Sequence, residues 1–191
     1  MRPGLLIVAP LALIVLGPVL FGDGARVAAD PLPPGSLGMT VGLVSGTGAD
    51  AKNLGFGYLL GGQATWQPMD TERRIGWSVK SNVLFGTMYS ADAARINDQL
   101  LTLQFDLMVG VRIRPGDDPS RYLTARAGGA LFRANQVIPP QMYRAFAGGV
   151  ASVGVDQYIS GWMLNVDVRY GLIGTGPSEL GLVIGFAKTG P

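Results

Sequence analysis

The side chains that could do chemistry in this sequence are three carboxylates and four cations. They are Lys80, Asp106, Arg112, Arg126, Asp156, Asp167 and Arg169. The carboxylates alone could support general acid–base chemistry. The sequence has no histidine and no cysteine, which removes Ser–His–acid arrangements, cysteine nucleophiles and the commonest metal ligands. We therefore predict no enzyme activity, no catalytic residue, no metal site and no cofactor, and we look for a structural use of these charges.

The segment Leu101–Arg114 shows what positions them. Every second residue from Leu101 to Ile113 is large and apolar, whereas the residues between them are mostly polar, charged or small. A period of two predicts a β-strand with two unlike faces. The segment is longer than the usual strand of about 5–6 residues. Its length suits a tilted strand that crosses a bilayer, which needs roughly 9–11 residues plus its ends.

Seven further segments alternate in the same way, with turn-forming residues between them. The eight expected strands are Leu37–Ser45, Leu54–Gln67, Arg74–Tyr89, Leu101–Arg114, Tyr122–Arg133, Arg144–Asp156, Trp162–Leu172 and Glu179–Phe186. An even number of strands can close as an up-and-down meander without a free edge, as a bilayer requires. The sequence therefore predicts an all-β fold, an eight-stranded antiparallel transmembrane barrel. The connections after odd-numbered strands are longer on average, which is typical of outer loops and places both chain ends in the periplasm.

Composition agrees with a barrel whose exterior is apolar. Only 15% of the 191 residues are charged, and 29 are glycine. Both values depart from an average soluble domain, in which roughly 25% of residues are charged and about 7% are glycine. The net charge of +2 implies no strong field for nucleic acid, so we expect no nucleic-acid partner.

The identity of the residues on each face predicts which face is turned inward. The polar face carries small residues and charges of both signs, so we expect the seven charged residues named above to form an ion-paired network that plugs the lumen. The apolar face carries aromatic residues near the strand ends, where membrane barrels have their interfacial girdles. These expected girdle residues are Tyr58, Trp66, Trp77, Tyr89, Trp162, Tyr170 and Phe186. The alternative is a soluble lipocalin-like barrel, with its apolar face inside.

The first 29 residues are typical of a secretory signal peptide. Arg2 precedes the apolar run Leu5–Phe21, and Val27-Ala28-Ala29 places small residues at the expected cleavage site. An uncleaved membrane anchor is the alternative, because the run approaches the length of a spanning helix. We divide the chain into a signal peptide (1–29), a proline-rich lead-in (30–36) and a barrel domain (37–191).

Over residues 37–186 the pattern resembles the small eight-stranded outer-membrane barrels of the OmpA/OmpX-like family. The last segment, Glu179–Phe186, is similar to the signal by which the barrel assembly machinery recognises a final strand, with Gly181, Ile184 and Phe186 at matching positions. Ala187–Pro191 follow the terminal aromatic residue of that signal, which is a departure from the pattern. The resemblance implies a multi-pass protein of the Gram-negative cell envelope, which is porin-like and surrounded by outer-membrane lipid and lipopolysaccharide.

Three functions are compatible with these features. The first is a structural barrel that presents short loops to a surface protein or glycan. The second is a passive conduit for small hydrophobic molecules, for which Met88, Phe132, Val137 and Met142 are the candidate lining residues near the outer end. The third is the soluble lipocalin-like binder.

Overall fold

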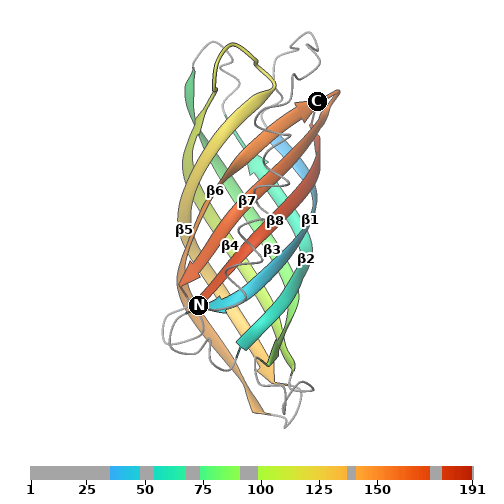
Figure 1. The fold of residues 1–191 in the computed structure, drawn as a ribbon, viewed down its shortest axis with the longest axis vertical. Coiled ribbons are helices and arrows are strands. Elements are labelled where there is room, and N and C mark those ends of the chain that lie inside the picture. Colours follow the sequence, from blue (N-terminus) through green and yellow to red (C-terminus); the bar gives the residue numbers. More distant parts are fainter. Residues whose placement is uncertain are drawn as a thin grey trace.

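The computed structural model describes residues 35–47, 54–67, 74–90, 99–136, 141–172 and 178–190, and their strands form one closed barrel in chain order (Figure 1). The strands are β1 (Gly35–Thr47), β2 (Leu54–Trp66), β3 (Ile75–Ser90), β4 (Gln99–Ile113), β5 (Arg121–Gln136), β6 (Gln141–Ile159), β7 (Trp162–Leu172) and β8 (Ser178–Thr189). The predicted eight-stranded antiparallel barrel is confirmed. The expected signal peptide, its cleavage site and most of the lead-in lie outside the described residues, and β1 begins at Gly35, inside the lead-in.

The barrel closes between its first and last strands. β1 pairs antiparallel with β2 on one side and with β8 on the other, so that Val41 lies opposite both Leu60 and Ile184. Gly190 N also donates a hydrogen bond to Gly35 O at 2.9 Å. Closure leaves neither strand with an unpaired edge along the shared register, which a strand in lipid requires. Among the described residues, no helix is long and apolar enough to cross a membrane.

A tight turn connects β6 to β7. Ile159 pairs with Trp162, and the two residues between them, Ser160 and Gly161, have φ values of 48° and 81°. Positive φ at both central residues is the geometry of a type I′ turn, whose twist matches that of the flanking strands. This turn lies at the same end of the barrel as the junction of Gly35 with Gly190, because Thr189 N donates to Gly161 O at 3.0 Å.

The two faces of the strands have the predicted orientation. On β4, Phe105 is 47% exposed and its neighbour Asp106 is fully buried. The same alternation holds on β1, where Leu37 is 72% exposed and Thr40 is buried. Apolar side chains therefore cover the outside and the buried charged side chains point inside, so the lipocalin-like alternative is wrong.

Three apolar residues of the outer face depart from this exposure pattern. Val155, Val166 and Leu182 lie at outward positions by strand alternation, because their neighbours Asp156, Asp167 and Val183 are the inward ones, but their own side chains are buried. Val166 and Leu182 pack against each other. The outer face is thus mostly exposed over β1–β5, whereas several of its apolar side chains on β6–β8 are buried.

The strands extend further than the sequence predicts, and this weakens one expectation. β5 continues to Gln136 and β6 begins at Gln141, so the connection between them is shorter than expected. With these bounds the connections after odd-numbered strands have almost the same average length as the others, so the expected length difference is much smaller than the sequence suggests. The pairing of β6 with β7 begins only at Gly149, opposite Leu172. The preceding part of β6, from Gln141 onward, pairs with β5 alone (Figure 1). The β5–β6 hairpin therefore projects beyond the end of β7.

Candidate functional site

All seven charged residues singled out from the sequence lie inside the barrel. β3 contributes one of them, β4 two, β5 and β6 one each, and β7 two. Each side chain is buried. Strand alternation explains this placement, because on every strand the flanking apolar residues occupy the opposite face. The structure divides the seven among two ion-paired groups and an aromatic cluster.

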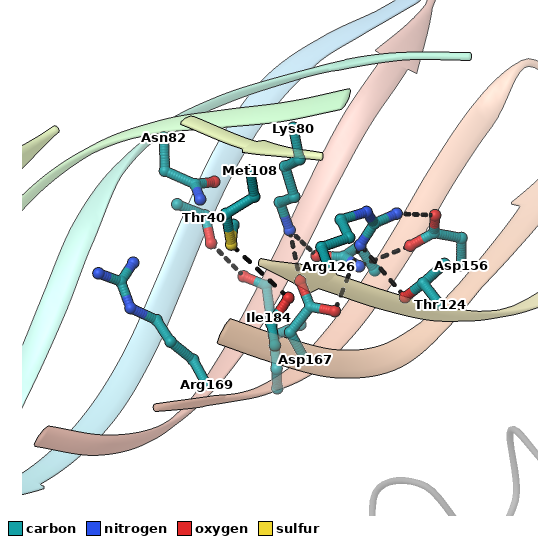
Figure 2. Close-up of polar contacts among 12 residues, drawn as sticks. Thr40, Lys80, Asn82, Met108, Thr124, Arg126, Asp156, Asp167, Arg169 and Ile184 are labelled. Carbon is teal, nitrogen blue, oxygen red and sulfur yellow. Dashed lines mark hydrogen bonds and ion pairs between the residues drawn. The ribbon is translucent and has the colours of Figure 1, made fainter. Parts of the chain in front are cut away.

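The first group, which we call the Arg126 group, joins four strands around two carboxylates (Figure 2). Lys80 Nζ on β3 donates to Asp167 Oδ2 on β7 at 2.6 Å, and Arg126 Nη1 on β5 lies 3.5 Å from the other oxygen of Asp167. Arg126 Nη2 pairs with Asp156 Oδ2 on β6 at 2.5 Å. Asn165 donates to Asp156 at 2.6 Å and accepts from Lys80, which closes a ring of contacts across the lumen.

Uncharged neighbours complete the coordination of the Arg126 guanidinium. Its Nε donates to Ser78 Oγ at 3.0 Å and its Nη1 donates to Thr124 Oγ1 at 3.2 Å. Gly154 makes room for the carboxylate of Asp167, because a Cβ at this glycine would overlap that side chain. Burial of a charge is tolerated when it is both paired and hydrogen-bonded, and this site meets both conditions.

The second group, which we call the Arg169 group, ties β7 to β3, β4 and β8. Arg169 pairs with Asp106, and its Nη2 donates to Gln104 Oε1 at 2.7 Å. Asp106 also accepts from Asn82 Nδ2 at 2.6 Å. Glu179 on β8 completes the group: its Oε1 lies 3.3 Å from Arg169 Nη2, and its Oε2 accepts from Gln104 Nε2 at 2.9 Å.

Sequence reasoning missed Glu179 as a member of the interior network. Its side chain is buried at the start of β8, where we expected only the polar first residue of the assembly signal. The signal that could have found it was its parity, because Glu179 shares a face with Gly181 and Gly185. With Glu179 included, the buried ionisable side chains of the described residues are four cations (Lys80, Arg112, Arg126, Arg169) and four carboxylates (Asp106, Asp156, Asp167, Glu179). The described interior is therefore formally neutral.

Arg112 lies in an aromatic cluster near the end of the barrel that contains Gly35 and Gly190. Its guanidinium carbon lies 4.5 Å above the ring of Tyr122, a cation–π contact. Tyr122 meets Tyr158 edge to face at 6.0 Å, and Gln67 donates to the Tyr158 hydroxyl. Met163 and Ala187 pack against the two tyrosines. The seven residues that the sequence suggested as one network are thus divided among the Arg126 group, the Arg169 group and the aromatic cluster, which lie at different levels along the barrel axis.

Apolar residues fill the lumen at the opposite end. Val44, Leu59, Leu84 and Met88 form a buried cluster against which Leu100 packs. Of the four residues proposed to line a conduit, Met88 and Phe132 are buried, Val137 lies outside the described residues, and the side chain of Met142 is not described. In the β5–β6 register, Phe132 is paired with residue Phe146. This end of the described interior is packed with hydrocarbon.

Most of the expected girdle residues pair with one another on the outer face. The ring centroids of Trp66 and Trp77 lie 4.6 Å apart, and those of the stacked rings of Trp162 and Phe186 lie 4.5 Å apart. Both pairs are near the end of the barrel that contains the first and last described residues. Tyr58 and Tyr89 lie 6.5 Å apart toward the other end, and Tyr170 is exposed. Of the expected assembly-signal residues, Gly181 faces inward beside Val44, while Ile184 and Phe186 face outward.

The chemical capacity of the interior follows from these contacts. Asp106, Asp156 and Asp167 each accept from a cation that is itself buried, so none stands as a free general base. Among the residues that the structure describes, no three potential metal-ligating side chains come together. The arrangement binds the walls of the barrel to one another.

Comparisons with known proteins bear on the fold. No protein-family model and no curated protein sequence matches the chain. Neisserial surface protein A has a TM-score of 0.60 and 11% identity, over 84% of this chain and 100% of that one. Ail, the attachment invasion locus protein of Yersinia pestis, has a TM-score of 0.53 and 11% identity, over 84% and 99%. The outer membrane protein OprG from Pseudomonas aeruginosa has a TM-score of 0.53 and 10% identity, over 84% and 97%.

One further solved structure carries a ligand in its description. It is Ail in complex with the heparin analogue sucrose octasulfate, with a TM-score of 0.52 and 12% identity, over 81% of this chain and 95% of that one. Identities this low show a shared fold. The fold is that of the small eight-stranded barrels of the bacterial outer membrane.

Proposed function

We propose that this chain, an eight-stranded barrel of the bacterial outer-membrane type, serves as a closed and non-catalytic anchor that presents its loops to partners at the cell surface. One observation carries the proposal. The interior is occupied by ion pairs that join strands around the lumen, while the exterior is apolar. A barrel built in this way is suited to holding a position in lipid and is poorly suited to moving solutes through its centre.

The closed lumen is the first part of the proposal. An ion that crossed the barrel would have to displace Lys80 from Asp167 or Arg126 from Asp156, and each pair is buried and further hydrogen-bonded. It would then meet the apolar cluster of Val44 and its neighbours, which offers no polar partner. A hydrophobic constriction resists the entry of water and ions.

Orientation in the membrane is the second part. The chain enters and leaves the barrel at the end that carries the two-residue β6–β7 turn, and export by an N-terminal signal would leave this end in the periplasm. The opposite end, with the β5–β6 projection, then faces outward. The aromatic pairs Trp66–Trp77 and Trp162–Phe186 would lie at the periplasmic interface, and Tyr58–Tyr89 at the outer one.

A surface glycan or protein is the partner class that we propose for the outer end. The Ail complex with a heparin analogue supports the glycan as a partner of this fold. The segments between strands at this end contain cations such as Lys52 and Arg95 as well as acids. The barrel assembly machinery is the partner that we propose for the β8 residues Gly181, Ile184 and Phe186.

The experiment that tests closure is a conductance recording from purified protein in planar bilayers. We expect no steady conductance from protein whose heat-modifiable gel mobility shows that it is folded. Arg126→Ala combined with Asp156→Ala removes a buried pair without leaving either charge alone, and any conductance should appear first in this variant. Steady conductance from the unaltered protein would overturn the proposal. Binding of immobilised heparin and neutral glycans to whole cells tests the partner class separately.

A second candidate function is favoured by the apolar cluster at the outer end. The apolar side chains of Leu59, Leu84 and Met88 line the lumen at positions where a conduit for small hydrophobic molecules would need an apolar wall. Uptake of a hydrophobic fluorophore into liposomes distinguishes the two functions. We expect uptake equal to that of protein-free liposomes if the cluster is a seal, and faster uptake that Leu84→Asp abolishes if it is a conduit.

A further inference from the structure

The outer face of the barrel has a hollow over β4 to β7. Its volume is about 510 Å³, within the range of roughly 300–1,000 Å³ that is usual for sites of small ligands. Ala125, Ala127 and Ala151 form its floor, and Val109 and Tyr170 stand on either side. Its lining is almost wholly apolar, and it opens toward the surface that the bilayer would cover.

Two glycines continue this floor toward the outer end of the barrel. Gly129 on β5 lies directly opposite Gly149 on β6, and both are exposed. A Cβ at Gly129 would meet no atom within 4 Å, and one at Gly149 would meet only a backbone oxygen at 3.8 Å. By contrast, a Cβ at the inward neighbour Gly128 would overlap the carbonyl of Leu107. Packing within the chain therefore requires Gly128, but it does not require the outward pair.

The hollow is a local feature of the exterior. Across the barrel, the outer face of β1–β3 carries exposed large side chains such as Leu37, Trp77 and Phe85. On β5 and β6 the outward side chains at mid-strand are alanines and glycines, and Leu131 and Val153 mark the two ends of this stretch. A uniform coat of lipid would not need this difference between the two sides.

A cation stands on the same face beyond the outer end of the hollow. Arg133 is exposed on β5, next to Leu131 in the outward series that begins at Ala125. The distance from Ala127 to Arg133 along the strand is about 20 Å, at roughly 3.3 Å per residue. For a strand tilted by about 40°, the rise along the membrane normal is about 15 Å. The apolar band of such barrels is about 25 Å tall, so a guanidinium that far above mid-strand reaches the head-group level.

We propose that this hollow, together with the outward strip that continues from Ala127 and Ala151 past the Gly129–Gly149 pair to Arg133, binds a phosphorylated, multiply acylated lipid of the outer leaflet. Arg133 contacts a phosphate, and one acyl chain lies over the glycines and alanines. The proposal rests on the outer-membrane orientation given above and adds a specific lipid site to it. The charge at one end of this strip favours a lipid as the occupant, because phosphate and hydrocarbon are presented together by one molecule.

Native mass spectrometry of the purified full chain in detergent tests the proposal, with bisphosphorylated lipid A and phosphatidylethanolamine as the two probes. Gly149→Leu covers the strip next to the hollow with a side chain that the bilayer tolerates. Arg133→Gln removes the charge and keeps the length. The matched control is Gly62→Leu, because Gly62 is an outward glycine of β2 whose Cβ would meet nothing closer than 3.7 Å.

We expect the unaltered protein and Gly62→Leu to retain lipid A in preference to phosphatidylethanolamine. Gly149→Leu should weaken retention about tenfold, and Arg133→Gln should remove the preference for lipid A. Equal retention by all four proteins would overturn the proposal, and so would a dimer that Gly149→Leu disrupts, because the occupant would then be a second copy. Heat-modifiable mobility and the conductance recording report separately on the proposed anchor function.

Discussion

The β1–β2 hairpin and the arc from β3 to β7 close the same barrel by different means. Neither β1 nor β2 contains a charged residue, and a Cβ at Gly38 or Gly61 would overlap the backbone of the neighbouring strand. The arc from β3 to β7 supplies every buried charge except that of Glu179. One side of the lumen therefore carries no charge and the other side fills it with long charged side chains, although close backbone approach at glycine also occurs on the charged side, as at Gly128.

This difference teaches how a narrow lumen can hold charges without leaving voids. Side chains as long as Lys80 and Arg126 need room in front of them, and an all-round lining of such residues would be overpacked. Gly154 provides such room directly, because a Cβ there would overlap the carboxylate of Asp167. Gly185 illustrates the fit on the glycine side, because a Cβ there would overlap the amide of Gln63.

The largest expected effect comes from adding volume to the glycine side. Gly61→Val would drive a Cβ into the carbonyl of Val83, which only a backbone shift could relieve. We expect loss of the heat-resistant folded band or a destabilisation above about 4 kcal/mol in urea titration. Gly62→Val is the control, since its side chain would point outward into open space. Equal stability of the two variants would show that close approach is not what selects glycine here.

The next effect comes from removing charge from the other side. Arg126→Ala leaves Asp156 and Asp167 with fewer partners in the interior, and the expected cost is about 3–5 kcal/mol for a fully desolvated pair. Urea unfolding in detergent micelles measures it. Arg74→Ala is the matched control, because its pair with Asp117 is exposed and should matter little. A small loss in both variants would mean that water reaches the interior group.

A double-mutant cycle sharpens the comparison within the charged side. Arg169→Gln and Asp106→Asn each break one contact of the Arg169 group, and we expect an interaction energy of about 1–3 kcal/mol between them. The same Asp106→Asn change combined with Arg74→Ala should be additive. Additivity in both cycles would show that the buried contact contributes no coupling.

The smallest effect lies outside the membrane, at the β4–β5 turn. Partial burial raises the pKa of Asp118, but hydrogen bonds from the hydroxyl and backbone N–H of Ser120, together with nearby Arg121, bring it below the ordinary value of 3.8. A carboxyl whose folded pKa is depressed contributes stability above its unfolded pKa and loses it as pH falls through the folded value. We therefore expect Asp118→Asn to flatten the stability profile slightly below about pH 4. Urea titrations from pH 2 to 6 measure it, and an unchanged profile would contradict the assignment.

Much of the fold follows from the sequence because alternation is a local property. Leu101–Arg114 coincides with β4 within two residues at its start and one at its end. The weaker alternation of Tyr122–Arg133 still marks β5, although alanine and glycine occupy the middle of its outward series. Strand ends were less predictable, since β5 and β6 continue through residues with no apolar alternation as far as Gln136 and Gln141.

The interior was predictable only in part, for a physical reason. Parity tells which residues face the lumen, but it does not tell their height, which depends on strand tilt and register. Asp106 and Arg112 share a face of β4, and the structure places them in different clusters. Leu59 and Leu84 were missed because an apolar residue at an inward position looks like an interruption of the pattern, whereas Met88 of the same cluster was among the expected lining residues. The burial of Val155, Val166 and Leu182 on the outer face had no signal in the sequence.

The overhang of β6 beyond the last residue of β7 has a mechanical consequence. In the orientation proposed above, this two-stranded projection would act as a stalk that carries the β5–β6 connection away from the lipid surface. A short peptide tag spliced into residues 137–140 would then be accessible to antibodies on living cells. The β5–β6 projection would be the place on the molecule where binding of a new partner could be acquired without disturbing the barrel strands.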